Sequence, residues 1–531
     1  MDQTGSSPRR QAGETAASST LVAGLLDPGA YDHPVDSLEL IETHISWVIL
    51  TGNYAYKIKK PVDLGFVDFS TLAKRHHYCA EEVRLNRRLA PAFYLGVIPV
   101  TGSPDAPHFG GDGVAIEYAV KMRQFSPSAQ LDRLLERGEL EGHHLDAFAT
   151  FIADFHQRVS VAGASVKHGG PEQIIAPAME NFPELRRCLP DPASAQGIAE
   201  LEQWTVRAFA RLRETFQQRK RDGFVRECHG DLHLRNLAWV NDSPLVFDCL
   251  EFNPDLRWID VLNEVAFLVM DLEARQQPAL AARFLNLYLE CTGDYAGLTV
   301  LPFYLVYRAL VRAKVDGIRA RQAGIDDREK ILAEAEARRY LALAQGCTQS
   351  GPPRLILTRG VSASGKTTLS GALVEKLGAI RIRSDVERKR MAGLSPEADA
   401  RAEIGQGIYN SAGSRRTYAR LLELAGQVLD AGFSVIVDAA FLDVSQRAPF
   451  GKMAAARNIA CTIIEATAPP DLLRERIVSR TRGASDADLA VLEHQLDRWQ
   501  PLTTDESAHA LQVDTSLPLD RGELVARLTD A

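Results

Sequence analysis

The stretch RLILTRGVSASGKT at residues 354–367 decides how the C-terminal part of the chain folds. Its apolar start predicts a buried strand, and the glycines at 360 and 365 enclose a short loop that ends in Lys366-Thr367. Such a loop turns backbone N–H groups toward a common centre, where they can bind phosphate oxygens at the start of a helix. The spacing G-x-x-x-x-G-K-T, placed between a strand and a helix, favours a P-loop over a turn that is merely rich in glycine.

This loop is expected to surround a nucleotide and its metal ion. Lys366 can reach the β and γ phosphates and act in catalysis, and the Thr367 hydroxyl can ligate Mg²⁺. The residues that we predict to bind the nucleotide are Gly360, Ser362, Ala363, Ser364, Gly365, Lys366, Thr367 and Thr368. ATP and Mg²⁺ are therefore the expected cofactors.

Two features outside the loop fit the same chemistry. Asp438 ends the apolar strand 435–437, where its carboxylate can hold the metal or assist the acceptor; the alternative is a helix cap. Arg480 belongs to an arginine-rich helical stretch that can form a mobile lid over the phosphates, and the alternative is a solvated basic face.

The segment RSDVERKR at residues 383–390 is the candidate acceptor site. Asp385 can take a proton from an acceptor hydroxyl as a catalytic base, and Arg383 and Arg388 can hold an anionic acceptor. The alternative is an N-cap aspartate on a basic, solvated helix. The sequence does not decide between them.

The motifs GVSASGKTTLS, IRSDVERKR and VIVDAAFL and the arginine-rich lid resemble small P-loop kinases related to gluconate kinase, zeta toxins and polynucleotide kinase. The resemblance covers about residues 354–531. It implies a parallel sheet with ATP at the carboxyl ends of the strands and phosphoryl transfer to a hydroxyl. The alternation of RLILTR, FSVIVDA and ACTIIEA with helical stretches independently predicts an α/β domain with a parallel sheet.

A second set of chemical residues lies in CHGDLHLRN, residues 228–236, which is followed by the strand-like LVFD. Asp231 can accept the proton of an incoming hydroxyl as a catalytic base, and Asn236 and Asp248 can hold Mg²⁺ against ATP phosphates. Two alternatives are a zinc site built on Cys228 with the neighbouring histidines, for which a second cysteine pair is missing, and a polar loop that only caps helices.

This segment resembles the catalytic loop of the aminoglycoside phosphotransferase and choline kinase families, which share the protein-kinase-like fold. The resemblance implies an ATP-anchoring lysine, for which Lys57 is preferred and Lys59 is close behind, because both share one strand face. It also implies Glu82 as the pairing glutamate, residues 50–53 as a cover for the nucleotide, and residues 117–122 as a hinge that contacts the base. Cys249-Leu250 replaces the Phe-Gly of protein kinases, which argues against a protein kinase.

Joined together, the two resemblances describe a bacterial fusion of an aminoglycoside-phosphotransferase-like domain and a P-loop kinase domain. The fold class expected is an α+β bilobal kinase-like domain followed by an α/β P-loop domain with a parallel sheet. Changes in composition predict a disordered tail at 1–20, the kinase-like domain at 21–345, a linker at 346–353 and the P-loop domain at 354–531.

Composition limits the partners. The chain of 531 residues has a formal net charge of -8, which argues against nucleic acid as a partner. Seven scattered cysteines, no signal-like start and no long apolar run predict a cytoplasmic protein without a membrane span.

We expect a bifunctional phosphotransferase acting on hydroxyls of small molecules. The alternatives are one active kinase gated by the other domain as a nucleotide sensor, and a polynucleotide 5'-kinase in the C-terminal domain. Neither acceptor nor oligomeric state follows from the sequence.

Overall fold

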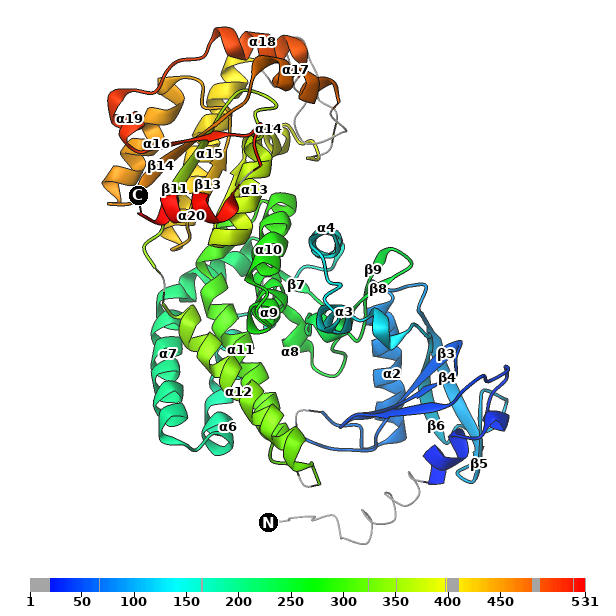
Figure 1. Cartoon of the computed structure of the whole chain (residues 1–531). Coiled ribbons are helices and arrows are strands. Elements are labelled where there is room, and N and C mark those ends of the chain that lie inside the picture. The colour runs from blue at the N-terminus through cyan, green and yellow to red at the C-terminus, as the bar shows by residue number, and fades with distance from the viewer. Residues whose placement is uncertain are drawn as a thin grey trace. The chain divides into compact units, whose positions relative to one another are not determined.

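Figure 1 shows the chain as a computed structural model, which describes residues 20–65, 67–163, 166–322, 324–349, 351–396, 398, 410–479, 488–518 and 520–530. The chain forms two compact units. The first comprises Met1–Leu140, Asp154–Ile174 and Gln217–Glu264, and the second comprises Glu141–Ala153, Ile175–Phe216 and Val265–Ala531. Of the tail predicted at 1–20, only residue 20 lies within the described residues, and it begins a short helix.

The first unit contains a six-stranded antiparallel sheet in the order β1-β2-β3-β6-β4-β5. Its strands are β1 (Glu39–Glu42), β2 (Ser46–Leu50), β3 (Tyr54–Lys59), β4 (Tyr94–Ser103), β5 (Ala106–Phe109) and β6 (Glu117–Arg123). Helix α2 (Leu72–Asn86) begins where the Thr71 hydroxyl accepts a hydrogen bond from the Lys74 N–H. It packs Cys79 and Val83 into one apolar cluster with Tyr94 and Val120 of the sheet. This lobe therefore has the α+β composition that the sequence predicted.

Two short β-ribbons frame the candidate catalytic loop of the first unit. β7 (Val225–Glu227) pairs with β10 (Trp258–Asp260), and β8 (Leu237–Val240) pairs with β9 (Ser243–Val246). The second ribbon turns at Asn241-Asp242, where both residues adopt positive φ angles of 51° and 54°. Asn and Asp tolerate this left-handed conformation, which suits a tight hairpin. Asp248 therefore follows the second strand of the ribbon at a fixed place.

Helices make up most of the middle of the chain. They are α3 (Leu131–Glu136), α4 (Gly142–Arg158), α5 (Pro171–Met179), α6 (Asn181–Cys188), α7 (Pro192–Arg221), α8 (Pro254–Arg257), α9 (Val261–Ala274), α10 (Pro278–Thr292), α11 (Leu301–Arg319) and α12 (Asp327–Cys347). Within the second unit α11 packs along α12 and α6. In the part of the chain that the structure describes, every helix is too short or too polar to span a bilayer.

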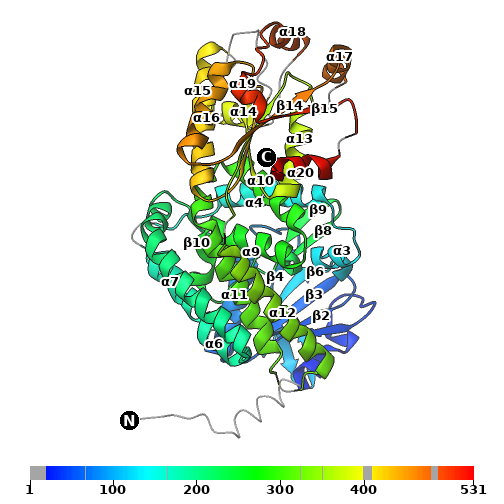
Figure 2. The ribbon, with the colours of Figure 1, turned by 60° about the vertical axis from the view of Figure 1, so that its left-hand side comes forward.

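The second unit also holds a five-stranded parallel sheet in the order β12-β13-β11-β14-β15. Its strands are β11 (Leu355–Arg359), β12 (Ile380–Arg383), β13 (Val435–Asp438), β14 (Cys461–Thr467) and β15 (Ala510–Asp514). Its helices are α13 (Lys366–Leu377), α14 (Ser384–Met391), α15 (Ser411–Asp430), α16 (Val444–Ala456), α17 (Pro470–Val478), α18 (Leu489–Asp497), α19 (Thr504–Ala508) and α20 (Arg521–Asp530). Figure 2 shows α15 and α16 on one face of this sheet and α13 and α20 on the other.

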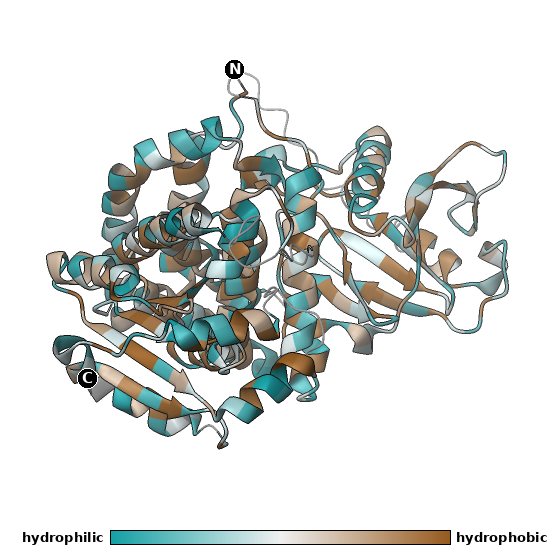
Figure 3. Ribbon diagram, turned by 90° about the horizontal axis from the view of Figure 1, so that it is seen from above, coloured by the Kyte–Doolittle hydropathy of each residue, from teal (hydrophilic) through white to brown (hydrophobic). Residues whose placement is uncertain are grey.

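The strands of both large sheets are rich in apolar residues, as the hydrophobic colouring of Figure 3 shows. All five residues of β11 and all four of β13 are buried. Strands covered on both faces read as continuous apolar runs, which is why these segments were recognisable in the sequence. The expected α+β kinase-like fold followed by an α/β domain with a parallel sheet is thus confirmed.

Candidate active sites

Asp231, Asn236 and His233 converge in the loop between β7 and β8. Asn236 Nδ2 donates hydrogen bonds to Asp231 Oδ2 at 2.9 Å and to the Asp231 carbonyl at 3.0 Å. His233 Nε2 lies 3.2 Å from the same carboxylate, whose side chain is 37% exposed. The loop thus holds Asp231 rigidly while leaving its carboxylate accessible to an incoming group.

His229 stabilises this loop from the buried side. Its Nε2 lies 2.8 Å from the Phe247 carbonyl, and its Nδ1 accepts the Asp231 N–H at 3.2 Å. Burial lowers the pKa of His229, so the ring stays neutral with Nε2–H as the donor. Both ring nitrogens are therefore engaged in protein hydrogen bonds, which disfavours the zinc alternative.

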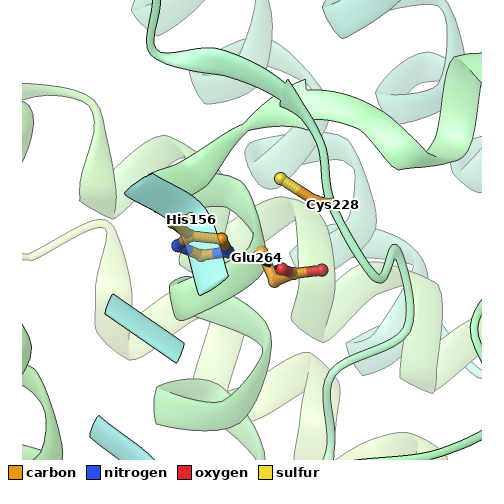
Figure 4. Close-up of side chains that lie close together, drawn as sticks. All are labelled: His156, Cys228 and Glu264. Carbon is orange, nitrogen blue, oxygen red and sulfur yellow. Dashed lines mark hydrogen bonds and ion pairs between the residues drawn. The ribbon is translucent and has the colours of Figure 1, made fainter. Parts of the chain in front are cut away.

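Three buried residues of types that can ligate a metal, His156, Cys228 and Glu264, lie close together next to the start of the loop (Figure 4). Ligand atoms of His156, Cys228 and Glu264 lie within 4.8 Å of one another, and all three residues are buried. His156 Nε2 is 2.6 Å from Glu264 Oε2, and Glu264 Oε1 accepts the Gly230 N–H at 2.7 Å. Burial raises the pKa of the Cys228 thiol well above its usual value. The cluster therefore serves to anchor the catalytic loop.

Asp248 stands opposite this loop at the end of β9. It adopts a positive φ of 64°, and its N–H donates to the Tyr94 hydroxyl at 3.1 Å. Its side chain is 45% exposed and accepts a hydrogen bond from Lys57 Nζ. The strained backbone is held by its neighbours so that the carboxylate projects outward.

Two lysines and two glutamates form a buried charge cluster beside Asp248. Lys57 Nζ lies 3.0 Å from Glu82 Oε1, and Lys59 Nζ lies 2.7 Å from Glu82 Oε2. Lys59 also pairs with Glu251, and its side chain is fully buried. The shared strand face and the choice of Glu82 over Glu81 as the residue facing both lysines agree with the sequence-based expectation.

Electrostatics fix the charge state of the cluster. Burial alone would raise the pKa of Glu82, but Lys57 and Lys59 together lower it to about 2. Burial alone would lower the pKa of Lys57, yet Asp248 and Glu82 raise it well above its usual value. Both groups are therefore ionised at neutral pH. Burial raises the pKa of Glu251 against the opposing charge of Lys59.

The two candidate lysines differ in what they face. Lys57 reaches the exposed carboxylate of Asp248, whereas Lys59 is enclosed by Glu82 and Glu251. This geometry favours Lys57 as the residue nearest an incoming phosphate. Sequence reasoning missed Glu251, although it stands only three residues after Asp248 in the same acidic run.

Residues 117–122, expected as a hinge, are instead part of β6. This strand pairs on both sides, with β3 and with β4, so its backbone groups are used inside the sheet. The hinge expected from the resemblance is therefore wrong for these residues, because their backbone groups pair with neighbouring strands. The loop expected to cover the nucleotide is tied down by Gln124, whose Oε1 accepts the N–H groups of Thr51 and Gly52 at 3.0 Å.

The glycine-rich loop of the second unit follows β11 and enters α13. Gly360, Ala363 and Gly365 all have positive φ angles, of 155°, 62° and 86°. A Cβ at Gly360 would lie 2.4 Å from Ser364 Oγ and 2.7 Å from the Ala466 carbonyl, so only glycine fits there. Lys366 Nζ donates to the Val361 carbonyl at 2.6 Å, across the loop. The conformation is that of a phosphate cradle.

Side chains from distant segments brace the loop. Gln495 Oε1 accepts the Ser362 N–H at 2.6 Å, and Arg476 donates to the Ala363 carbonyl at 3.3 Å and to Thr515 Oγ1 at 2.9 Å. The hydroxyl-bearing residues Thr367 and Thr368 are exposed at the start of α13. The expected lid residue Arg480 lies outside the described residues.

Asp438 lies beside this loop at the end of β13. Its Oδ2 accepts the Ser370 hydroxyl at 2.9 Å, and its Oδ1 lies 3.4 Å from Thr358 Oγ1 of the neighbouring strand. The next helix, α16, is capped by Asp443 instead. The helix-cap alternative for Asp438 is therefore wrong.

The candidate acceptor residues lie at the end of β12. Arg388 pairs with Asp385 at 2.9 Å, and Arg383 pairs with Glu290 of α10 at 3.3 Å. Burial alone would lower the pKa of Arg383, but the carboxylates of Glu290, Asp438 and Asp385 raise it. The N-cap of α14 is Arg383, without a side-chain cap bond, so the N-cap alternative for Asp385 is wrong.

The residues of both sites fit ATP and Mg²⁺. Asn236 and Asp248 supply the hard oxygen ligands that Mg²⁺ prefers, next to a lysine that can meet a phosphate. In the second site only glycine fits at residue 360, and the loop leads into the start of α13, where backbone N–H groups can bind phosphate oxygens.

Comparisons with known proteins agree with this geometry. A model described as "Phosphotransferase enzyme family" matches residues 79–301, and a model described as "AAA domain" matches residues 355–502. Uncharacterized proteins of Mycobacterium tuberculosis and Mycobacterium bovis are 33% identical to this chain over 497 residues, which are 92% of this chain and 95% of each relative.

Solved structures resemble the two parts of the chain separately. A choline/ethanolamine kinase family protein from Mesorhizobium loti is 13% identical and covers 63% of this chain and 99% of its own, with a TM-score of 0.36. A gluconokinase from Sinorhizobium meliloti is 20% identical and covers 34% of this chain and 96% of its own, with a TM-score of 0.25. From the full-length similarity and the two family matches, the chain belongs to the family of these mycobacterial proteins, and it is an ATP-dependent kinase in which a phosphotransferase domain precedes a P-loop kinase-like domain.

Proposed function

We propose that the chain is a bifunctional phosphotransferase with two separate Mg-ATP sites, each of which transfers the γ-phosphate to a hydroxyl of a small molecule. The observation that carries the proposal is the presence of two complete and unrelated sets of phosphate-handling residues. One is the set of Asp231, Asn236, Asp248 and Lys57, and the other is the glycine-rich loop with Asp438.

In the first site Asp231 accepts the proton of the acceptor hydroxyl as the phosphoryl group arrives. Its carboxylate is exposed and fixed by Asn236, so proton transfer needs no rearrangement of the loop. Asn236 and Asp248 would hold Mg²⁺, which neutralises charge on the phosphates when bound. Lys57 would exchange its contact with Asp248 for a phosphate oxygen while Glu82 keeps the ammonium group in place.

In the second site the backbone N–H groups of the loop and Lys366 would bind the phosphates. Lys366 leaves the Val361 carbonyl to do so, and Thr367 with Asp438 would hold Mg²⁺. Asp385 would accept the acceptor proton. All three arginines of the acceptor segment, Arg383, Arg388 and Arg390, already face carboxylates, so these side chains offer little unbalanced positive charge. A neutral hydroxylated molecule therefore suits this site better than a polynucleotide.

Nucleotide binding and turnover test the proposal. Calorimetry of the full chain with a non-hydrolysable ATP analogue and Mg²⁺ should show two sites, and Lys366→Ala should leave one. Lys376→Ala is the matched control, because Lys376 lies exposed at the other end of the same helix. A single site in the wild type that Lys366→Ala does not affect would contradict the P-loop half of the proposal.

Turnover at the first site is tested in the Lys366→Ala background. ADP release from Mg-ATP with mixtures of small hydroxylated metabolites should depend on Asp231 and be lost in Asp231→Asn by about a hundred-fold or more. Asp242→Asn, the same change in the exposed hairpin turn, is the control. Undiminished release in Asp231→Asn would show that another group is the base.

A further inference from the structure

The edge of the parallel sheet in the second unit is covered by a helix from the preceding domain. β12 is the edge strand, and α10 lies against it. Asn286 of α10 accepts the Arg381 N–H at 2.6 Å and donates to the Ala379 carbonyl at 3.1 Å. Ala282, one turn earlier, belongs to the same apolar cluster as Ile356 and Leu373 of the P-loop domain. The side-chain amide thus replaces the pairing that a further strand would give.

Glu290 extends this contact by one more helical turn. It is 3% exposed and bridges two arginines of β12. Its Oε1 lies 2.9 Å from Arg381 Nη2, and its Oε2 lies 3.3 Å from Arg383 Nη1. Residues two apart on a strand share a face, so one carboxylate can serve both guanidinium groups. Because the buried Glu290 carboxylate pairs with two guanidinium groups, it restricts the orientations of both arginine side chains and of its own.

The two arginines extend to the groups that handle the phosphate. Arg381 Nη1 lies 3.4 Å from Ser370 Oγ and 3.5 Å from the Thr367 carbonyl. Ser370 Oγ in turn donates to Asp438 at 2.9 Å. The negative charges of Asp438 and Asp385, like that of Glu290, raise the pKa of Arg383. Glu290 is therefore linked to Asp438 through two side chains, Arg381 and Ser370.

We propose that Glu290 is a positioning residue of the P-loop site, which is built jointly by the P-loop domain and by α10. This inference rests on the proposed function of that site. Helix α10 lies within residues 79–301, which match the phosphotransferase model. A residue of the phosphotransferase segment would therefore orient the site of the P-loop segment. Without the Glu290 charge, Arg381 and Arg383 would turn to Asp438 and Asp385 and draw those carboxylates away from their roles.

The test uses the full chain with Asp231→Asn, so that only the P-loop site turns over. The readout is ADP release from Mg-ATP with water as the acceptor, together with the affinity for a fluorescent ADP analogue. Glu290→Gln should lower kcat about ten-fold, the size typical of a lost supporting contact, with little change in nucleotide affinity. Glu290→Asp, which keeps the charge, should recover part of this loss.

Arg283→Gln is the matched control on the same helix. Arg283 bridges Asp146 at 2.6 Å and Glu375 of α13 at 2.9 Å, so it also joins α10 to the P-loop domain but touches neither Arg381 nor Arg383. It should leave kcat unchanged. Equal losses in Arg283→Gln and Glu290→Gln, or none in Glu290→Gln, would overturn the inference.

Failure of the proposed function itself gives a different result. In that case the Asp231→Asn parent shows no ADP release that Lys366→Ala abolishes, and the Glu290 variants have nothing to change. A fall in kcat and nucleotide affinity together, with a lower unfolding temperature in both Glu290 variants, would mean that Glu290 only holds the fold, which also overturns the positioning role.

Discussion

Replacing Glu82 by glutamine is expected to open the antiparallel lobe around β3. Glu82 is fully buried and is the counter-ion of both Lys57 and Lys59, so its removal leaves two buried cations with fewer partners. Breaking a buried ion pair from one side is more costly than removing both partners, because the remaining charge cannot return to water. The lysines would then depend on Asp248 and Glu251 alone.

The magnitude follows from the pKa of Glu82. That pKa falls from 4.5 to about 2, a difference of 2.5. At about 1.36 kcal/mol per pKa unit, this is about 3 kcal/mol of stabilisation of the ionised form. Because the folded pKa lies below the unfolded one, the stabilisation is complete above about pH 4.5 and is lost as the pH falls toward 2.

Hydrogen exchange of β3 peptides in the full chain measures this opening. At pH 7 a loss of about 3 kcal/mol corresponds to exchange about 150-fold faster in Glu82→Gln than in the wild type. Glu81→Gln is the matched control, because Glu81 pairs with the exposed Arg84 and such a pair contributes less than about 1 kcal/mol. Exchange in Glu82→Gln within three-fold of the wild type would refute the assignment of Glu82 as an ionised, buried counter-ion.

Three other changes test separate features of the sites. His156→Leu leaves Glu264 without its buried partner and should cost about 3 kcal/mol of stability, measured as faster exchange in the catalytic loop; unchanged exchange would show that the cluster is not an anchor. Gly365→Ala should strain the P-loop by about 1–2 kcal/mol and weaken ATP binding about ten-fold, whereas Gly378→Ala, also at a positive φ but in open space, should leave ATP affinity intact. Burial lowers the pKa of His229, so below about pH 6.5 the ring stays neutral in the folded chain while it binds a proton in the unfolded chain. This difference costs stability as the pH falls, so the unfolding temperature should fall less steeply with acid in His229→Gln than in the wild type.

The sequence predicted the structure best at positions whose backbone conformation or close contacts only one residue type tolerates. The P-loop could be predicted because Gly360 and Gly365 adopt angles or close contacts that other residues resist. Strands β11 and β13 were equally visible, because burial on both faces favours runs of apolar residues in them. The pairing of Lys57 and Lys59 with Glu82 was expected from the resemblance to the kinase families, and the structure brings these three side chains together.

Contacts between segments far apart in the chain could not be predicted. Glu290 and Asn286 have no local signature, since a glutamate and an asparagine on a helix are ordinary surface residues until a partner covers them. The hinge was misplaced for a related reason. Whether residues 117–122 connect two lobes or fill the centre of a sheet depends on which strands lie on either side, and only the fold decides this.

The covered edge of β12 has a practical consequence for anyone who divides the chain. A fragment cut at the linker predicted at 346–353 would keep all five strands of the parallel sheet but lose α10. Its edge strand would then present free backbone groups, and Arg381 and Arg383 would lose their shared carboxylate. An open edge of this kind is a template for pairing between molecules, so such a fragment is expected to self-associate more strongly than the intact chain.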